Sequence, residues 1–327
     1  MDLQKFLTEA VARVQHQVPA PQRALIAASG GIDSTVAAVV VGRALGDRAT
    51  ALFVDTGLLR KGEVERTREV LSGAGLEPHV VPAGPRFFEA LKGVTDPERK
   101  RKIIGETFIR VFEKEAAAIH ADFLVQGTIA PDWIESGGSA GPGGPTALGS
   151  ARDTIKSHHN VGGLPSDMKL RLVEPLRDLY KDEVRGLARL LKVPEPERQP
   201  FPGPGLAVRV VGEVTPERAA TVRVACAVVE EEVERAVKEG RIPRPWQYFA
   251  TLLPVRTVGV IGDVRTYGDA VSIRMVESLD AMTATALSVP PELLRRIAER
   301  ITRELSGKVT RVLYDVTDKP PATIEWE

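Results

Sequence analysis

The chain has 327 residues, which is enough for two domains that each bury a hydrophobic core. Lysine and arginine together number 44, as do aspartate and glutamate, so the chain lacks the basic excess of a duplex-binding protein; its one short basic cluster is 99–102. A single cysteine, Cys226, excludes both an internal disulfide framework and a cysteine-rich zinc site. Neither a signal peptide nor an apolar run of membrane-spanning length is visible. We therefore expect a reducing, cytoplasmic location, and no membrane or nucleic-acid partner.

The first part of the chain alternates strand-like and helix-like segments. Strands are predicted at 24–28, 49–54, 79–81, 123–125 and 170–173, and helices at 33–45, 62–74, 97–120 and 181–191. This alternation predicts an α/β fold with a doubly wound, mostly parallel sheet that helices cover on both faces. Ligands bind such sheets beyond the carboxyl ends of the strands, so the loops after Ala28, Val54 and Val125 are the expected walls of a site.

The pattern changes twice further along the chain. Residues 131–165 are rich in glycine and too long for an ordinary connection, which predicts a lid, a binding loop or disorder; the lid is the expectation followed below. Proline and glycine crowd between 194 and 205, so we expect one domain at 1–200 and a second at 201–327. In the second domain, strands are predicted at 207–211, 258–261, 270–274 and 310–314, and helices at 216–239 and 291–305. These runs of strands favour a smaller α+β domain.

The string Ser29-Gly30-Gly31-Ile32-Asp33-Ser34, between a predicted strand and a predicted helix, suits a phosphate group. Its two glycines let the backbone turn tightly and approach an anion, and the amides that open the helix carry partial positive charge. Ser29 and Ser34 add hydroxyl donors. Asp33, a carboxylate beside a phosphate, is expected to hold Mg²⁺ between the two. The nucleoside-triphosphatase P-loop is absent, because no Gly-x-x-x-x-Gly-Lys occurs.

This string resembles the loop of the ATP pyrophosphatase family, whose members cleave ATP between its α- and β-phosphates. Further strings resemble one branch of that family, the GMP synthases. They lie at 54–60, 96–105, 126–136, 155–165, 200–206 and 319–327. Thr56 departs from the pattern, since asparagine is more usual there. Because the strings follow the family's order along nearly the whole chain, the resemblance implies an adenine-nucleotide alpha hydrolase-like domain followed by the family's dimerisation domain.

The resemblance implies the amination of XMP to GMP, with ATP and Mg²⁺. The 2-oxygen of xanthine attacks the α-phosphate of ATP, and ammonia then displaces AMP from the adenylyl-XMP intermediate. It implies ATP contacts at Ser29, Gly30, Gly31, Ile32, Asp33, Ser34, Val54, Gly127 and Thr128. It implies XMP contacts at Arg101, Asp132, Gln247, Arg311, Lys319, Ile324 and Glu325. The catalytic residues that it implies are Asp33, through the metal, and Lys156 in the lid.

The source of ammonia follows from the cysteine count. Glutamine hydrolysis in this family needs a cysteine nucleophile, and Cys226 lies in a predicted helix of the second domain. We therefore expect a synthetase without a glutaminase domain, which uses free ammonia or receives it from a separate glutaminase subunit. The dimerisation domain implies a homodimer, with the helix at 216–239 and the strands after Val255 at its interface.

Two alternatives remain. The chain could be another adenylylating enzyme, such as NAD synthetase or a tRNA-thiolating enzyme, or a nucleotide-binding regulatory protein without turnover. The second alternative predicts damage to the loop or the lid, but Asp33, Ser34 and Lys156 are all present. The tail at 319–327 favours GMP synthase over NAD synthetase, and its prolines, Ile324 and Trp326 suggest that it is docked rather than loose.

Overall fold

The computed structural model describes residues 2–130, 170–193, 199–279 and 281–327. The predicted lid, 131–165, lies outside them. The chain divides into two compact units, which are described separately below. The first comprises residues 1–56, 62–83 and 101–197, and the second comprises 57–61, 84–100 and 198–327. Two short segments from the first third of the chain thus group with the C-terminal part.

The first unit is built on a parallel sheet, which has five strands in the described residues. They are β1 (Ala24–Ala28), β2 (Ala49–Asp55), β3 (His79–Pro82), β4 (Phe123–Val125) and β5 (Arg171–Val173), in the order β3-β2-β1-β4-β5. All four pairings are parallel. The chain runs outward from β1 to one edge and then from β4 to the other, so the doubly wound α/β sheet is confirmed.

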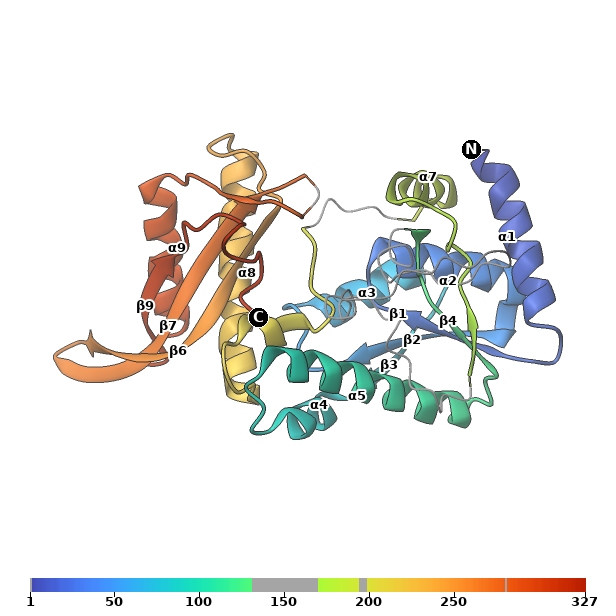
Figure 1. Cartoon of the computed structure of the whole chain (residues 1–327), viewed down its shortest axis with the longest axis horizontal. Coiled ribbons are helices and arrows are strands. Elements are labelled where there is room, and N and C mark those ends of the chain that lie inside the picture. The colour runs from blue at the N-terminus through green and yellow to red at the C-terminus, as the bar shows by residue number, and fades with distance from the viewer. Residues whose placement is uncertain (1, 131–169, 194–198, 280) are drawn as a thin grey trace, which may run out of the picture. The chain divides into compact units, whose positions relative to one another are not determined.

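Helices cover both faces of this sheet (Figure 1). They are α1 (Leu3–Gln17), α2 (Ile32–Leu45), α3 (Glu63–Gly73), α5 (Pro97–Ala118) and α7 (Lys181–Leu191), with the short helix η1 (Gly46–Arg48) before β2. Helix α1 was not predicted; its carboxylate cap, Asp2, accepts hydrogen bonds from the amides of Gln4 and Lys5. Helices α1, α2 and α7 share one apolar cluster, in which Phe6 of α1 packs with Val36 of α2 and Val184 of α7.

The second unit is centred on a mixed sheet, with four strands among the described residues. They are β6 (Gln247–Ile261), β7 (Val264–Glu277), β8 (Thr285–Ala286) and β9 (Val309–Tyr314). Strands β6 and β7 form a long hairpin, while β9 runs parallel to β7. Its helices are α4 (Gly84–Leu91), η2 (Gly205–Arg209), α8 (Pro216–Lys238) and α9 (Pro291–Glu304). This unit confirms the smaller α+β part. No helix in the described part of the chain is long and apolar enough to cross a membrane.

The strand predicted at 207–211 is wrong. Those residues begin in η2, and only Val210 makes an isolated bridge, to Leu252. Gly205 has φ +64°, and a Cβ there would lie 2.4 Å from the carbonyl oxygen of Leu58. The chain therefore turns tightly where a strand would run straight. Because residues 207–210 are all buried and only Arg209 among them is polar, the sequence period cannot distinguish a strand from a buried turn of helix.

Strands β6 and β7 are much longer than the predicted strands at 258–261 and 270–274. Glycines interrupt the β-branched pattern of their outer half, which lowers the strand signal there. The reason for these glycines is a close contact: a Cβ on Gly259 or Gly268 would lie 2.7 Å from the methyl carbon of Thr310 on β9. A two-residue turn, Gly262-Asp263, joins the strands, with Gly262 at φ +58°.

Candidate active site

The phosphate loop lies between β1 and α2, where Gly31 is the N-cap of α2. No side chain caps this helix, so its first amides have no acceptor within the helix. Gly30 has φ +78°, and a Cβ there would lie 2.5 Å from the hydroxyl oxygen of Thr67 in α3. The loop therefore presents the positive end of α2 to an anion, at a point where only glycine fits.

The two serines of the loop hydrogen-bond to each other rather than standing free. The Ser29 amide donates to Ser34 Oγ over 3.1 Å, and the two hydroxyl oxygens lie 2.9 Å apart. Ser34 Oγ donates to the carbonyl oxygen of Gly31 over 3.0 Å, so its only proton is used within the loop. Ser34 thus shapes the loop, and the backbone amides are the donors that remain for a phosphate.

Asp33 pairs with a lysine that the sequence analysis did not single out. Its Oδ2 lies 2.6 Å from Nζ of Lys181, the first residue of α7. Its Oδ1 is buried and has no hydrogen-bond partner among the described residues. A buried oxygen without a partner beside an anion-binding helix start fits a bound Mg²⁺. The described residues hold no group of three or more metal-ligating side chains, so phosphates and water would have to complete such a shell.

The other residues predicted to contact ATP follow the neighbouring strands. Strand β4 pairs with β1, which brings the turn after β4 to the start of α2. A Cβ on Gly127 would lie 2.7 Å from the amide nitrogen of Ser34. Thr128 is buried next to it, and Val54 is buried near the carboxyl end of β2, on the other side of β1. These residues therefore line one edge of the sheet, the edge at which ligands bind in this architecture.

Some of the residues predicted to contact XMP form one cluster in the second unit. Gln247 Nε2 donates to Glu325 Oε1 over 2.7 Å. Arg209 donates to both oxygens of Glu325, from Nε over 3.1 Å and from Nη2 over 2.8 Å. Ile324 is buried, and its carbonyl oxygen accepts from Nε of Arg274 over 2.9 Å. Arg209 and Arg274 were not predicted, because neither lies in a motif and their partners in the tail, Glu325 and Ile324, are 116 and 50 residues away along the chain.

The tail at 319–327 is docked, as its composition suggests. The Lys100 ammonium is completely buried, where it donates to the carbonyl oxygen of Val210 over 2.8 Å and pairs with Glu327. Burial lowers the pKa of Lys100, while the hydrogen bond and the charge of Glu327 oppose that shift. Glu327 also accepts from the amide of Gly212 over 3.0 Å. Lys100 therefore adds no charge to the surface part of the basic cluster 99–102, since it anchors the tail.

The remaining predicted residues lie elsewhere or outside the described residues. Lys319 donates from Nζ to the carbonyl oxygen of Ala281 over 2.8 Å. Arg311 is exposed on β9, and Arg101 is half-buried in α5, in the first unit. Asp132 and Lys156 lie outside the described residues.

Sheet and loop together define the class of this protein: an α/β protein with a parallel sheet and a glycine-rich loop that leaves the first amides of α2 uncapped. The chain is 58% identical to the B subunit of GMP synthase (glutamine-hydrolyzing) from Thermococcus kodakarensis, across 99% of each chain. It is 54% identical to the corresponding B subunit from Methanocaldococcus jannaschii, across 100% of this chain and 99% of the relative. The chain belongs to the family of GMP synthase B subunits.

A family model and a solved structure also match parts of this chain. Residues 231–326 match the family model described as the GMP synthase C terminal domain. Among solved structures, the NH3-dependent NAD synthetase from Campylobacter jejuni, in complex with the nitrate ion, is similar to 59% of this chain and 75% of its own chain. The identity there is 18% and the TM-score 0.45.

Proposed function

We propose that this chain is a ligase that aminates XMP to GMP, with ATP as co-substrate and an adenylyl-XMP intermediate. The observation that carries the proposal is the full-length similarity to the B subunits of GMP synthase, together with an intact phosphate loop. The xanthine 2-oxygen attacks the α-phosphate and pyrophosphate leaves; ammonia then forms the new C–N bond as AMP leaves. One ATP, one XMP and one ammonia thus give GMP, AMP and pyrophosphate.

In this reaction the loop has one task, to hold the leaving pyrophosphate. The uncapped amides of α2 donate to its oxygens, and the dipole of α2 favours the negative charge that develops there. Asp33 would hold Mg²⁺, which supplies charge neutralisation of the phosphates when bound. Lys181, which already pairs with Asp33, adds a positive charge at the same edge. Lys156 lies outside the described residues, so its role as the second catalytic residue remains a prediction.

For XMP, the tail cluster is the proposed contact surface. Glu325 accepts hydrogen bonds from a hydroxyl or an N–H, and Gln247 and Ile324 lie beside it. Lys319, Arg311, Arg101 and Asp132 complete the proposed set.

Ammonia is proposed to come from free ammonium or from a separate glutaminase subunit. The relatives are named as B subunits of a glutamine-hydrolyzing GMP synthase, which supports a division of labour between two chains. Cys226 is unsuited to be a glutaminase nucleophile. It is buried in α8, burial raises the pKa of its thiol although Arg209 opposes that shift, and the thiol donates to the carbonyl oxygen of Ala250. A reduced cysteine also fits the cytoplasm, where we propose that the enzyme works.

A homodimer is the proposed assembly, and the β6–β7 hairpin is its proposed contact. Val258, Val260 and Tyr267 are exposed on the outer part of this hairpin, and Val258 pairs with Tyr267 in the register. Apolar side chains gathered on one exposed face are typical of an interaction surface. Helix α8, the other predicted contact, has its apolar residues buried within its own unit.

The test is a reconstitution from pure components. The chain is mixed with ATP, Mg²⁺, XMP and ammonium, and AMP, pyrophosphate and GMP are followed. We expect XMP-dependent pyrophosphate release and GMP formation with ammonium, and no GMP when glutamine replaces ammonium. Pyrophosphate release that does not depend on XMP would contradict the proposal, and full activity with glutamine alone would contradict the separate glutaminase.

The variant Asp33→Asn tests the role of the carboxylate. It removes the charge that would hold Mg²⁺ and keeps the shape, so we expect XMP-dependent pyrophosphate release to fall about 100-fold or more, as for the loss of a group that stabilises developing charge. The matched control is Asp182→Asn, since the Asp182 side chain is 93% exposed and lies next to Lys181. Equal rates for the two variants would remove Asp33 from the mechanism.

A further inference from the structure

The carboxylate of Glu325 is held by hydrogen bonds from two side chains of its own unit. A carboxylate has about four acceptor positions. Arg209 fills two of them and Gln247 a third, with two of these three bonds on Oε1 and one on Oε2. The side chain of Glu325 is 15% exposed, so only a small part of it is accessible. One acceptor position on Oε2 therefore remains among the contacts of the described residues.

Arg209, which fixes that carboxylate, is itself held on every side. It is completely buried, and its guanidinium carbon lies 4.4 Å from the ring centre of Phe249 and 5.2 Å from that of Phe201. Nη1 points to Sγ of Cys226 over 3.8 Å. Burial alone would lower the pKa of Arg209, but the charges and hydrogen bonds of Glu325 and Cys226 together outweigh burial, and the pKa is raised. The guanidinium therefore stays charged, with its planar fork in one orientation.

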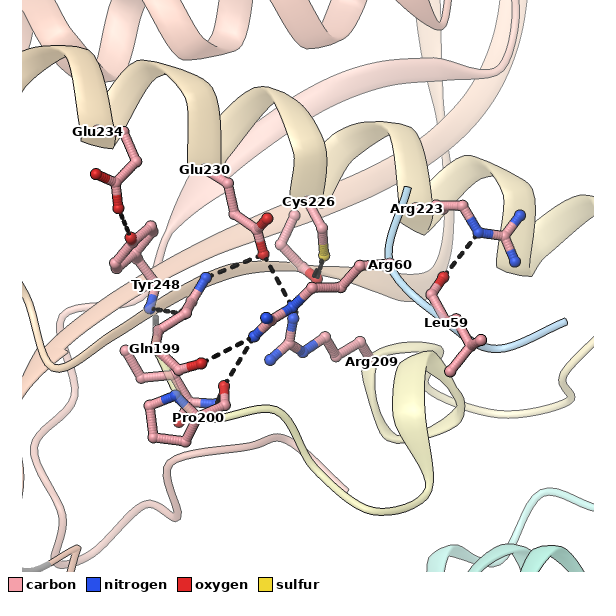
Figure 2. Close-up of polar contacts among 12 residues, drawn as sticks. Leu59, Arg60, Gln199, Pro200, Arg209, Arg223, Cys226, Glu230, Glu234 and Tyr248 are labelled. Atoms are coloured by element: carbon pink, nitrogen blue, oxygen red, sulfur yellow. Dashed lines mark hydrogen bonds and ion pairs between the residues drawn. The ribbon is translucent and has the colours of Figure 1, made fainter. Parts of the chain in front are cut away.

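One of the two aromatic rings beside Arg209 also contacts a second arginine. The guanidinium carbon of Arg60 lies 4.4 Å from the ring centre of Phe201. Figure 2 shows how Arg60 holds the segment before Phe201: Nη2 donates to the carbonyl oxygens of Gln199 and Pro200 over 3.1 and 3.0 Å, and Nε pairs with Glu230 over 3.3 Å. Gln199 in turn donates to Glu230 over 3.0 Å. The surroundings of Arg209 are thus themselves firmly bonded.

From this arrangement we propose that Arg209 is a positioning residue for nucleotide binding, which aims the one remaining acceptor position of Glu325 at a hydroxyl or N–H donor of XMP. Arg209 is completely buried, so it acts through Glu325 and does not touch the ligand. A phosphate is excluded at this point, because the carboxylate would repel it. The inference rests on the proposed function, in which XMP binds at Glu325.

The experiment is a double-variant cycle on the full chain, with XMP varied at saturating ATP, Mg²⁺ and ammonium. Arg209→Lys keeps the charge and loses the bidentate fork, and Arg209→Met loses both. We expect each to raise the KM for XMP about tenfold or more, the effect of losing a hydrogen bond that depends on a charged partner. The KM for ATP and kcat should change less than about twofold, because Arg209 makes no contact with reacting groups.

The second arm uses Glu325→Gln, which should raise the KM for XMP by itself. Adding Arg209→Met or Arg209→Lys to Glu325→Gln should raise it little further, because residues that act through one another are not additive. If the KM for XMP in the double variant rises by the product of the two single-variant increases, the proposal is overturned. The same holds if folded Arg209→Lys protein, checked by circular dichroism, has the wild-type KM for XMP. Arg209→Lys keeps the test available if Arg209→Met does not fold.

Arg300→Lys is the matched control for a general loss of stability. Arg300 pairs with the completely buried Glu232 over 2.7 Å in the same unit, through contacts that do not involve the tail. The variant should lower the unfolding temperature and leave the KM for XMP unchanged; a rise equal to that of Arg209→Lys would overturn the positioning role. If the wild-type chain releases no pyrophosphate with XMP at all, the proposed function fails first, and the inference fails with it.

Discussion

At the scale of single residues, Gly127 limits what the phosphate loop can tolerate. Its Cα faces the backbone of α2, so that a Cβ would lie 2.7 Å from the amide nitrogen and 2.8 Å from the Cα of Ser34. No flexible side chain can yield at this point, since both neighbouring atoms belong to the backbone. The amides that would bind pyrophosphate must therefore move if residue 127 gains a side chain.

We predict that Gly127→Ala lowers kcat/KM for ATP by about 10- to 100-fold, because a shift of about 1 Å in a positioned group can cost that much. The measurement is XMP-dependent pyrophosphate release at varied ATP. Gly73→Ala is the control: Gly73 ends α3 and has open space where its Cβ would lie. That variant should keep its activity. Wild-type kinetics for Gly127→Ala would show that the loop is not held as described.

The residues of the candidate site divide by the kind of signal they carry. Residues 29–34 could be predicted because two glycines, a carboxylate and a helix start are local features, visible in one short string. Lys100, Arg209 and Arg274 could not, because what makes each important is a partner far along the chain. Lys181 is an intermediate case. It follows β5, and because ligands bind at the carboxyl edge of such a sheet, its position in the sequence could have suggested it as a site residue.

At the scale of elements, helix α5 carries the anchor of the tail. Lys100 lies in its first turn, and the pair with Glu327 is closed off from water, since their side chains are 0% and 5% exposed. Breaking such a pair from one side leaves an uncompensated buried charge, whereas replacing both partners removes the charge problem.

We predict that Lys100→Met lowers the free energy of unfolding by about 3–5 kcal/mol and that adding Glu327→Gln restores part of it. Urea unfolding of the full chain measures both. Lys102→Met, two residues along the same helix, is the control; its side chain is 77% exposed and its pair with Glu106 should contribute less than about 1 kcal/mol. If the double variant is no more stable than Lys100→Met, the Lys100–Glu327 ion pair is not the tail's anchor.

The elements themselves were predictable where periodicity was strong. Strands β1 and β4 and helix α7 have the bounds expected from sequence. The two strands are short buried runs between turns, and the helix is amphipathic with clear ends, so the sequence pattern predicts a single type of element for each. The sequence pattern failed at η2, where a buried run that is apolar except for Arg209 turns at Gly205. It also shortened β6 and β7, because Gly259 and Gly268 serve a contact with Thr310 that only the sheet creates.

At the scale of the whole molecule, the exposed hairpin is the feature that its own unit leaves uncovered. Val260 and Val264, on either side of the turn, are 71% and 69% exposed. Long strands with exposed β-branched residues tend to associate unless something covers them. The proposed homodimer would provide that cover.

We predict that Val260→Glu, combined with Tyr267→Lys, converts the dimer to a monomer, because charges on both strands of the hairpin cannot be buried in an apolar contact. Light scattering of the purified chain measures the mass. Leu190→Glu in α7 is the control, since Leu190 is an exposed apolar residue of the first unit. A wild-type chain that is monomeric, or a variant that stays dimeric, would reject the hairpin as the contact.

The ion pair between Lys100 and Glu327 can form only late during synthesis of the chain. The two residues are 227 positions apart, so at 5–20 residues per second the ribosome adds Glu327 about 10–45 s after Lys100. During that interval Lys100, which is buried in the folded protein, has no partner in Glu327. Residues 57–61 and 84–100 likewise lack the later residues with which they form the second unit. The buried pair that Lys100 makes in the second unit can therefore form only after Glu327 has been added to the chain.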